Sequence, residues 1–158
     1  MLREKGSFKS SNTSQEAKYA IISTSWNSEI VDILLENAIS ELKNNNVKDK
    51  NILSIRVPGV FELPVTANKL ASLDFNAIIT LGCVIKGETP HFDIISNSCA
   101  LGLTQVSINK EVPIIFGVLT TNNIQQAKDR ANPSIGNKGM EAAETAMEMV
   151  ERLHALVK

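Results

Sequence analysis

The stretch Leu81 to Asp93, with the sequence LGCVIKGETPHFD, brings together side chains that could act on a ligand. An apolar run ends there, and Lys86, Thr89 and His91 follow within a few residues. Histidine titrates near neutral pH, so His91 is a candidate general acid or base. A structural histidine, bonded to backbone at the start of a helix, is an equally good interpretation of the spacing alone. In open α/β sheets ligands bind outside the carboxyl ends of the strands, so the other strand ends must decide between the two.

Two further corners between strands and helices, and one turn between helices, carry groups of complementary chemistry. Trp26 is the only tryptophan and stands in a polar turn, where it could form a platform for a planar ligand or a buried lid over the sheet edge. Glu62 could accept hydrogen bonds from a polyol, or its negative charge could simply stabilise the N-terminal end of its helix, where the helix dipole is positive. Arg130 and Lys138 flank a Gly- and Asn-containing turn suited to an anion, although a solvated charged turn is the more common meaning of such a pattern.

Strands and helices alternate along the whole chain. Apolar runs predict the strands, and apolar positions at helical spacing predict the helices between them. This order predicts an α/β fold, a three-layer sandwich in which a central, mainly parallel four-stranded sheet is flanked by helices. The expected strands are Lys18–Thr24, Asn51–Val57, Asn76–Ile85 and Pro113–Leu119, and the expected helices run from Ser28 as N-cap to about Lys43, from near Val60, from Phe92 to Asn109, from Asn123 to Arg130 and from Met140 to Leu156.

Length and composition exclude several classes of protein. With 158 residues, 43% of them hydrophobic and 21% charged, the chain predicts one globular domain, residues 17–158, behind a flexible N-terminal arm, residues 1–16. The formal net charge of −1 gives no footprint for nucleic acid, and no apolar run reaches the length of a membrane helix. Cys83 and Cys99 stand in apolar surroundings without ligand spacing. We therefore expect buried free thiols, no metal site and a cytoplasmic protein.

Six segments after the arm share one pattern over nearly the whole remaining chain: Trp26-Asn27, VPGVFELP at 57–64, LGCVIKGETPHFD at 81–93, PIIFGVLTT at 113–121, AKDRA at 127–131 and GNKG at 136–139. In this order and at these spacings they resemble the 6,7-dimethyl-8-ribityllumazine synthase family of riboflavin biosynthesis. The resemblance implies a flavodoxin-like sheet and a transferase without redox chemistry or cofactor. A ribitylamino-substituted aminouracil would condense with 3,4-dihydroxy-2-butanone 4-phosphate and release phosphate and water.

The resemblance also implies a role for each corner. Trp26 would stack on the pyrimidine, Asn27 would bind the substrate nearby, and Glu62 would hold ribityl hydroxyls. His91 would shuttle protons, and Arg130 would pair with the phosphate. Because the family builds its sites between neighbours in a homopentamer, Phe116 and the ribityl-binding groups would come from different subunits, and riboflavin synthase is a candidate partner. The remaining implied contacts are Gly59, Val60 and Phe61 along the ribityl channel, Cys83, Val84 and Ile85 beside the substrate, Gly87, Glu88 and Thr89 near the phosphate, and Phe116 and Lys138, which complete the site.

The chain departs from the family's pattern at three places. Lys86 stands where arginine is common, and Glu88 stands where a small residue is frequent. The carboxylate of Glu88 would repel a phosphate, so we expect it to point to solvent and to offer only its backbone to the ligand. Residues 132–135 replace the family's usual turn between the last two helices, which leaves the assembly of pentamers into larger particles open.

Two other functions are open at this stage. A flavin- or lumazine-binding module, or an assembly protein of the same fold, could keep the pocket and lose the chemistry, but it would have no need for His91. A flavodoxin-like electron carrier or phospho-receiver domain would need a phosphate loop dense in Ser, Thr and Gly, or an acidic cluster, after the first strand. The residues that follow Thr24 supply neither.

Overall fold

The computed structural model describes residues 6 and 8–157, and its centre is a parallel sheet of four strands. The strand order is β2-β1-β3-β4, so β1 and β3 are the inner strands and β2 and β4 are the edges. The inner strands are almost entirely buried, which agrees with their apolar sequences. The strands are β1 (Tyr19–Thr24), β2 (Ile52–Val57), β3 (Ala77–Ile85) and β4 (Ile114–Thr121).

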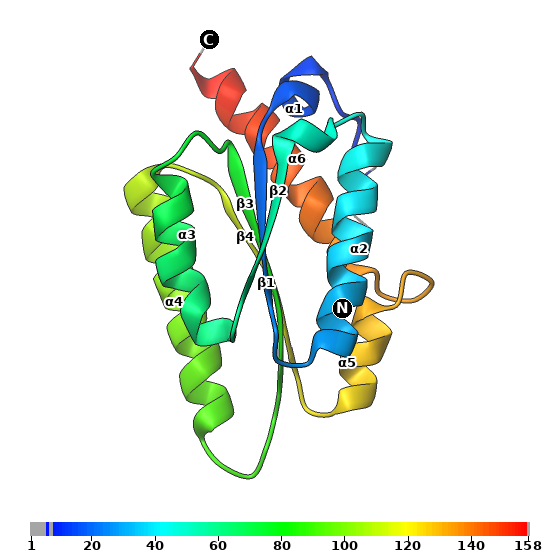
Figure 1. The fold of residues 1–158 in the computed structure, drawn as a ribbon, viewed down its shortest axis with the longest axis vertical. Helices are drawn as coiled ribbons and strands as arrows, with labels where there is room; N and C mark the ends of the chain where they lie inside the picture. The colour runs from blue at the N-terminus through cyan, green and yellow to red at the C-terminus, as the bar shows by residue number, and fades with distance from the viewer. Residues whose placement is uncertain (1–5, 7, 158) are drawn as a thin grey trace.

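Helices cover both faces of the sheet, so the predicted three-layer architecture is confirmed (Figure 1). One layer holds α3 and α4, and the other holds α2, α5 and α6 (Figure 1). The α-helices are α1 (Asn12–Glu16), α2 (Ser28–Asn44), α3 (Leu63–Ala71), α4 (His91–Lys110), α5 (Ile124–Ala131) and α6 (Lys138–Leu156), and two short 3-10 helices span Asp49–Asn51 and Val60–Glu62. Across the described ranges, no helix is both long and apolar enough to span a bilayer.

Alternation along β1 divides the core into two halves. Tyr19 and Ile21 point into the half that packs against α2 and α6, whereas Ala20 and Ile22 point into the half that packs against α3 and α4. Successive side chains of a strand face opposite sides of its sheet, so a strand covered on both faces is apolar at consecutive positions. The uninterrupted apolar run that predicted this strand therefore has a direct physical cause.

The predicted element boundaries agree with the structure to within two residues at most ends. The strand β4 continues to Thr121, two residues beyond its predicted end, because it stays paired with β3 as far as Ile85. The prediction of Ser28 as the N-cap of α2 is wrong. Asn27 holds that position with φ of 56°, in the left-handed region, and Ser28 is the first helical residue. The same helix ends as expected in the asparagine run, where Asn46 also has a positive φ.

A close crossing of α2 and α6 sets where α6 begins. A Cβ atom on Gly139 would overlap the backbone carbonyl of Leu34, so only glycine allows the two helices to approach this closely. The side chain of Asn137 caps the start of α6 by accepting a hydrogen bond from the backbone N–H of Met140, at 3.3 Å. Lys138 is therefore fixed as the first residue of the helix, two residues before the predicted start.

The segment before β1 is anchored to the far end of α6. A carboxylate oxygen of Glu151 accepts hydrogen bonds from the backbone N–H of Ser11 and the hydroxyl of Ser14, both at 2.7 Å. Partial burial would raise the pKa of the Glu151 carboxyl, but these hydrogen bonds outweigh it, and the pKa lies below its ordinary value of 4.5. Residues 11–16 of the expected arm are thus held against the domain, whereas residues 1–5 and 7 of that arm lie outside the described residues.

Candidate functional site

Three strand ends converge on one hollow, which we call the corner pocket. It has a volume of about 610 Å³ and lies where β1, β2 and β3 give way to the segments that follow them. The crevice rule for open α/β sheets predicts a ligand site at this edge. The residues that line the corner pocket are Trp26, Asn27, Gly59, Val60, Phe61, Glu62, Cys83, Val84, Ile85, His91 and Ile95.

Trp26 forms an open wall of the corner pocket, so the buried-lid alternative is wrong. The residue is 74% exposed, an unusual state for the largest aromatic side chain. Its backbone is nevertheless fixed, because the Trp26 N–H donates to the carbonyl of Pro58 at 3.2 Å. The neighbouring N–H of Ser25 bonds to Val57 at 2.9 Å, which ties the end of β1 to the end of β2. A fixed aromatic face open to solvent is suited to stacking on a planar ligand.

Gly59 lets the indole and a carboxylate approach each other. A Cβ atom at this position would lie 3.2 Å from Oε2 of Glu62 and 3.3 Å from Cδ1 of Trp26. Both side chains therefore lie over the Gly59 backbone, and the half-buried Glu62 presents its carboxylate next to the aromatic face. A carboxylate accepts hydrogen bonds only, so this wall can bind hydroxyl or N–H groups attached to a planar ring.

His91 is the first residue of α4 and lies at the mouth of the corner pocket. Its backbone N–H bonds to the hydroxyl of Thr89 at 3.4 Å. Within residues 8–157, no hydrogen bond holds the imidazole itself, and the side chain is exposed. The structural alternative, an imidazole bonded to backbone, is therefore not what the fold provides. The ring is open to a ligand in the corner pocket.

The loop between β3 and α4 passes beside the corner pocket without lining it. The N–H of Lys86 donates to the carbonyl of Thr121 at 2.8 Å, so the loop begins from a fixed point at the end of β4. Gly87, Glu88 and Thr89 are all exposed and are absent from the lining of the corner pocket. Their backbone is open to solvent between two residues that do line it, Ile85 and His91.

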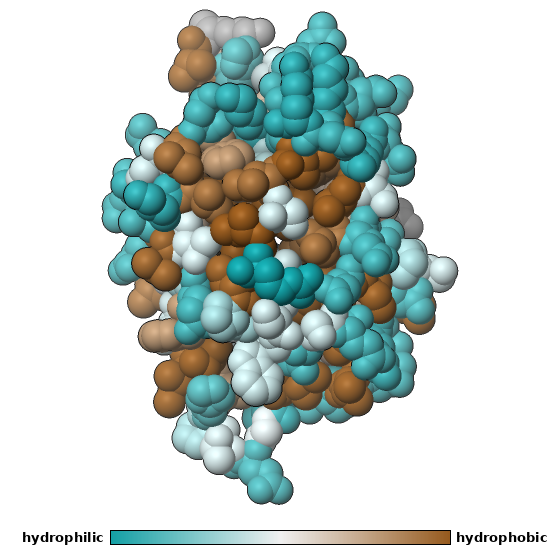
Figure 2. All heavy atoms as spheres, viewed as in Figure 1, coloured by the Kyte–Doolittle hydropathy of each residue, from teal (hydrophilic) through white to brown (hydrophobic). Residues whose placement is uncertain are grey.

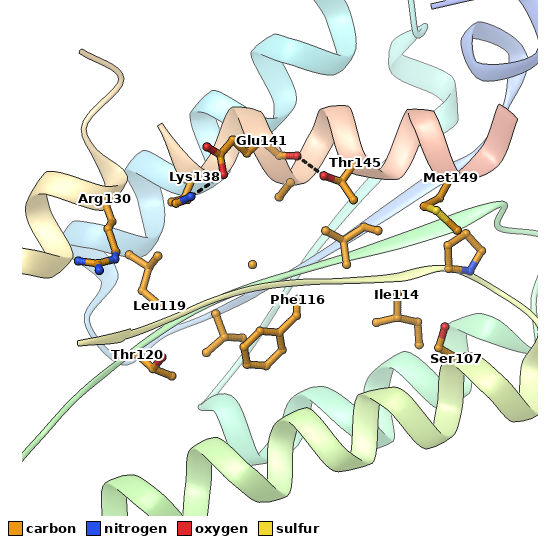
Figure 3. Close-up of a pocket in the computed structure, with 15 residues that line it drawn as sticks. Ser107, Ile114, Phe116, Leu119, Thr120, Arg130, Lys138, Glu141, Thr145 and Met149 are labelled. Carbon is orange, nitrogen blue, oxygen red and sulfur yellow. Dashed lines mark hydrogen bonds and ion pairs between the residues drawn. The ribbon is translucent and has the colours of Figure 1, made fainter. Parts of the chain in front are cut away.

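The other three predicted residues line a different hollow, which we call the edge hollow. It has a volume of about 670 Å³ and runs along the open edge strand β4, between that strand and α6 (Figure 3). Phe116, Arg130 and Lys138 all line it. Phe116 is 45% exposed and lies on the opposite side of β4 from Lys138 (Figure 3). The edge hollow and the corner pocket have no lining residue in common.

The two cations of the edge hollow differ in their partners. Lys138 forms an ion pair of 2.6 Å with Glu141, one turn further along α6. Arg130 is exposed and has no carboxylate partner in the described part of the chain. An unpaired guanidinium can bind a phosphate through two parallel hydrogen bonds. Sequence reasoning missed Glu141, although its spacing of three residues from Lys138 on a helix is a recognisable signal for such a pair.

Both cysteines are buried, as predicted. Burial raises the pKa of the Cys83 thiol to about 11 and that of the Cys99 thiol to about 12, so both stay neutral at physiological pH. Cys83 lines the corner pocket as an apolar wall rather than as a nucleophile. In the ranges that the structure describes, no group of three or more His, Cys, Asp or Glu side chains has the geometry of a metal site.

Comparison with known proteins connects this geometry to one reaction. The sequence model of the 6,7-dimethyl-8-ribityllumazine synthase family matches residues 16–154. A 6,7-dimethyl-8-ribityllumazine synthase of Bacteroides fragilis (strain YCH46) is 43% identical over 142 residues, which cover 89% of this chain and 99% of that protein. The match covers every segment that lines the corner pocket and the edge hollow.

Proposed function

The chain belongs to the 6,7-dimethyl-8-ribityllumazine synthase family, and from this premise we propose how its two hollows divide the work. The protein is a transferase of riboflavin biosynthesis. It condenses 5-amino-6-(D-ribitylamino)uracil with 3,4-dihydroxy-2-butanone 4-phosphate and releases phosphate and water. One substrate is a planar ring with a polyol chain, and the other is a small anion. In the same way, the corner pocket offers an aromatic face and a carboxylate, and the edge hollow offers two cations.

The corner pocket binds the pyrimidine. Trp26 stacks on the ring, and Cys83, Val84 and Ile85 form the apolar wall beside it. Glu62 accepts hydrogen bonds from ribityl hydroxyls, and the backbone of residues 59–61 lines that channel. The observation that supports this assignment is the 74% exposure of Trp26 on a backbone fixed by Pro58, because such a platform becomes covered only when something binds to it.

The edge hollow of a neighbouring copy supplies the anion site. Arg130 binds the phosphate because its guanidinium has no partner within residues 8–157, and Lys138 adds a second positive charge. Phe116 of that neighbouring copy covers the side of the interface that faces the pyrimidine ring. The backbone of Gly87, Glu88 and Thr89 faces this anion from the first copy, and the exposed Glu88 side chain stays in solvent.

His91 moves the protons of the condensation. The amine of the pyrimidine attacks the ketone carbonyl, and the resulting carbinolamine loses water to give an imine. Loss of a proton from the carbon next to the imine then drives out phosphate, which leaves with the electron pair of its C–O bond. The enol left behind takes up a proton on its terminal carbon and becomes a ketone, and attack of the ribitylamino nitrogen on this ketone closes the ring and releases a second water. A histidine at the pocket mouth can take up and return these protons, a contribution of about a hundred- to ten-thousand-fold. Holding the two substrates as an oriented pair contributes the rest.

The surface supports assembly into a homopentamer. Both edges of the sheet are open, and Leu53 on the edge strand β2 is 38% exposed. Figure 2 shows apolar side chains gathered over the middle of one face, where Figure 1 places this sheet edge. On α4, Ile94, Leu101 and Ile108 recur every seven residues and are all exposed. Apolar stripes of this kind are normally covered by another surface. We place the assembly in the cytoplasm, with riboflavin synthase as a candidate partner.

The test of the function is product formation. Purified protein is mixed with both substrates, and the fluorescence of the lumazine is followed against a sample that lacks the sugar phosphate. We expect turnover that requires both substrates. A protein that binds the pyrimidine but forms no product would support the alternative of a catalytically silent binding or assembly protein.

A further inference from the structure

Asn27 adopts an arrangement that an N-cap residue does not require. Its backbone lies in the left-handed region, and its carbonyl accepts hydrogen bonds from the N–H groups of Ile30 and Val31 at 3.0 Å. An asparagine at this position normally also caps the helix with its side chain, but the Asn27 side chain makes no capping hydrogen bond. The side chain is therefore committed elsewhere.

The amide of Asn27 spans the gap between two strand ends. Its Nδ2 donates to the backbone carbonyl of Cys83 at 2.9 Å. Paired residues of β1 and β3 end at Ser23 and Leu81, so Cys83 lies beyond the last rung of their ladder. The side chain thus continues the connection between the two strands after the backbone of β1 has turned away.

This bridge leaves Trp26 between two fixed points. On one side, the Trp26 N–H bonds to Pro58 in the turn after β2. On the other side, the next residue is tied to Cys83, which is followed by the pocket-lining residues Val84 and Ile85. The distance and angle between the indole and the end of β3 are set by these two hydrogen bonds. A planar ring must fit between those two walls.

We propose that Asn27 is a positioning residue, whose amide bridge to Cys83 fixes Trp26 at the correct spacing from the end of β3 for the pyrimidine. Asn27 thus acts through Trp26 instead of binding the substrate with the bridging nitrogen. The inference rests on the proposed role of the corner pocket as the pyrimidine site. It adds that the selectivity of this pocket depends on one side-chain hydrogen bond that joins β1 to β3.

Two variants isolate the bridge from the backbone conformation. Asn27→Gly keeps the left-handed conformation and removes the bridge, and Asn27→Asp keeps the shape but places a carboxylate against the Cys83 carbonyl. Asn46→Gly is the matched control, because Asn46 also has a positive φ, of 67°, and lies at the other end of α2. Trp26 is the only tryptophan, so its emission reports on this corner alone.

The readouts are the KM for each substrate, the anisotropy of Trp26 emission and its quenching by the lumazine. For both Asn27 variants we expect a KM for the pyrimidine raised on the order of tenfold, the scale of one lost hydrogen bond, and a lowered Trp26 anisotropy. The KM for the sugar phosphate and the values of Asn46→Gly should stay near those of the wild type.

Each contrary outcome has a separate meaning. An unchanged KM for the pyrimidine together with unchanged Trp26 anisotropy would overturn the inference. A KM raised equally for both substrates, with a lowered unfolding temperature, would reduce Asn27 to a structural residue and also overturn it. Wild-type Trp26 emission that the lumazine fails to quench would instead count against the proposed function of the corner pocket.

Discussion

The corner pocket and the edge hollow are built in opposite ways. The corner pocket lies among three segments that are hydrogen-bonded to one another, through Trp26 to Pro58 and through Asn27 to Cys83. The edge hollow lies along the edge strand β4 and is lined from α4, α5 and α6, and its cation Arg130 has no partner in the described ranges. The segments of the corner pocket are tied to one another within one chain, whereas the edge hollow is an open surface.

This difference indicates what a second copy has to supply. A ring needs a slot of fixed width, which local hydrogen bonds can build within one chain. A phosphate needs charge and donors, which a surface can present to a neighbour. Catalysis by proximity requires the two substrates to meet, and in the proposed assembly the surface of one copy faces the pocket of the next. The following predictions act on one region at a time.

The largest effect is expected from loss of the proton-transfer group of the corner pocket. His91→Ala should lower kcat by about a hundred- to ten-thousand-fold, with the KM for the pyrimidine little changed, because the imidazole moves protons and does not hold the ring. The control is His154→Ala, which removes the other histidine, exposed near the end of α6. Steady-state rates of lumazine formation measure both variants. Near-wild-type turnover of His91→Ala would show that His91 is not the group that transfers the protons.

Loss of the unpaired cation should affect the edge hollow alone. Arg130→Ala should raise the KM for the sugar phosphate by about ten- to a hundredfold, the scale of charge-assisted hydrogen bonds, and leave pyrimidine binding intact. Arg152→Ala is the matched control, since Arg152 lies on α6 and forms an exposed ion pair with Glu148. Separate titrations of the two substrates distinguish the effects. A parallel loss of pyrimidine affinity would mean that the two regions are not independent.

A smaller effect is expected where the indole and the carboxylate meet. Gly59→Ala would place a Cβ 3.2 Å from Glu62 and 3.3 Å from Trp26, so both side chains must shift by a few tenths of an ångström. The KM for the pyrimidine should rise a few-fold, and the KM for the sugar phosphate should not change. Gly6→Ala is the control, because its Cβ would have no neighbour within 4 Å. Equal KM values for wild type and Gly59→Ala would contradict this prediction, because they would show that Trp26 and Glu62 can shift without weakening pyrimidine binding.

The smallest effect on catalysis is expected from the anchor of α1, which lies outside both regions. A carboxylate with a lowered pKa stabilises the folded state above its ordinary pKa of 4.5. That contribution disappears as the pH falls through the lower folded pKa. Protection against hydrogen exchange at residues 11–16, relative to the unfolded rate at the same pH, should therefore fall in acid, while Glu151→Gln should lower it at neutral pH. Turnover of Glu151→Gln should match the wild type. Unchanged protection at residues 11–16 in this variant would contradict the role of Glu151 as anchor.

Much of the fold follows from the sequence because the strongest signals are local. The inner strands β1 and β3 are mostly apolar since both of their faces are covered. The cap of α2 could not be predicted in this way, because the Asn27 side chain bonds to Cys83, 56 residues away. Ser28, the residue type with the better local preference, was predicted instead.

The candidate site shows the same limit. Strand ends and the family resemblance together identify Trp26, Glu62 and His91, and these three residues do line one pocket. Arg130 and Phe116 are identified by the same resemblance, but no local pattern indicates that they line a separate hollow. That separation depends on the position of β4 at the edge of the sheet, which is a property of the whole fold.

The most direct test of the central claim is complementation between two impaired variants, assayed at a sugar phosphate concentration far below the KM expected for Arg130→Ala. His91→Ala damages the corner pocket, and Arg130→Ala damages the edge hollow. If each site joins the corner pocket of one copy to the edge hollow of another, oligomers formed by co-expressing the two variants contain some sites with both residues intact. Random mixing in a closed ring makes these about a quarter of all sites.

We predict that the co-expressed oligomer recovers about a quarter of wild-type turnover, far above either variant alone. A mixture of the two purified proteins that cannot exchange subunits is the control, and it should show only the average turnover of the two separate variants. Recovery no greater than the average of the two separate variants would contradict the account, because it would place His91 and Arg130 in the same site of a single chain.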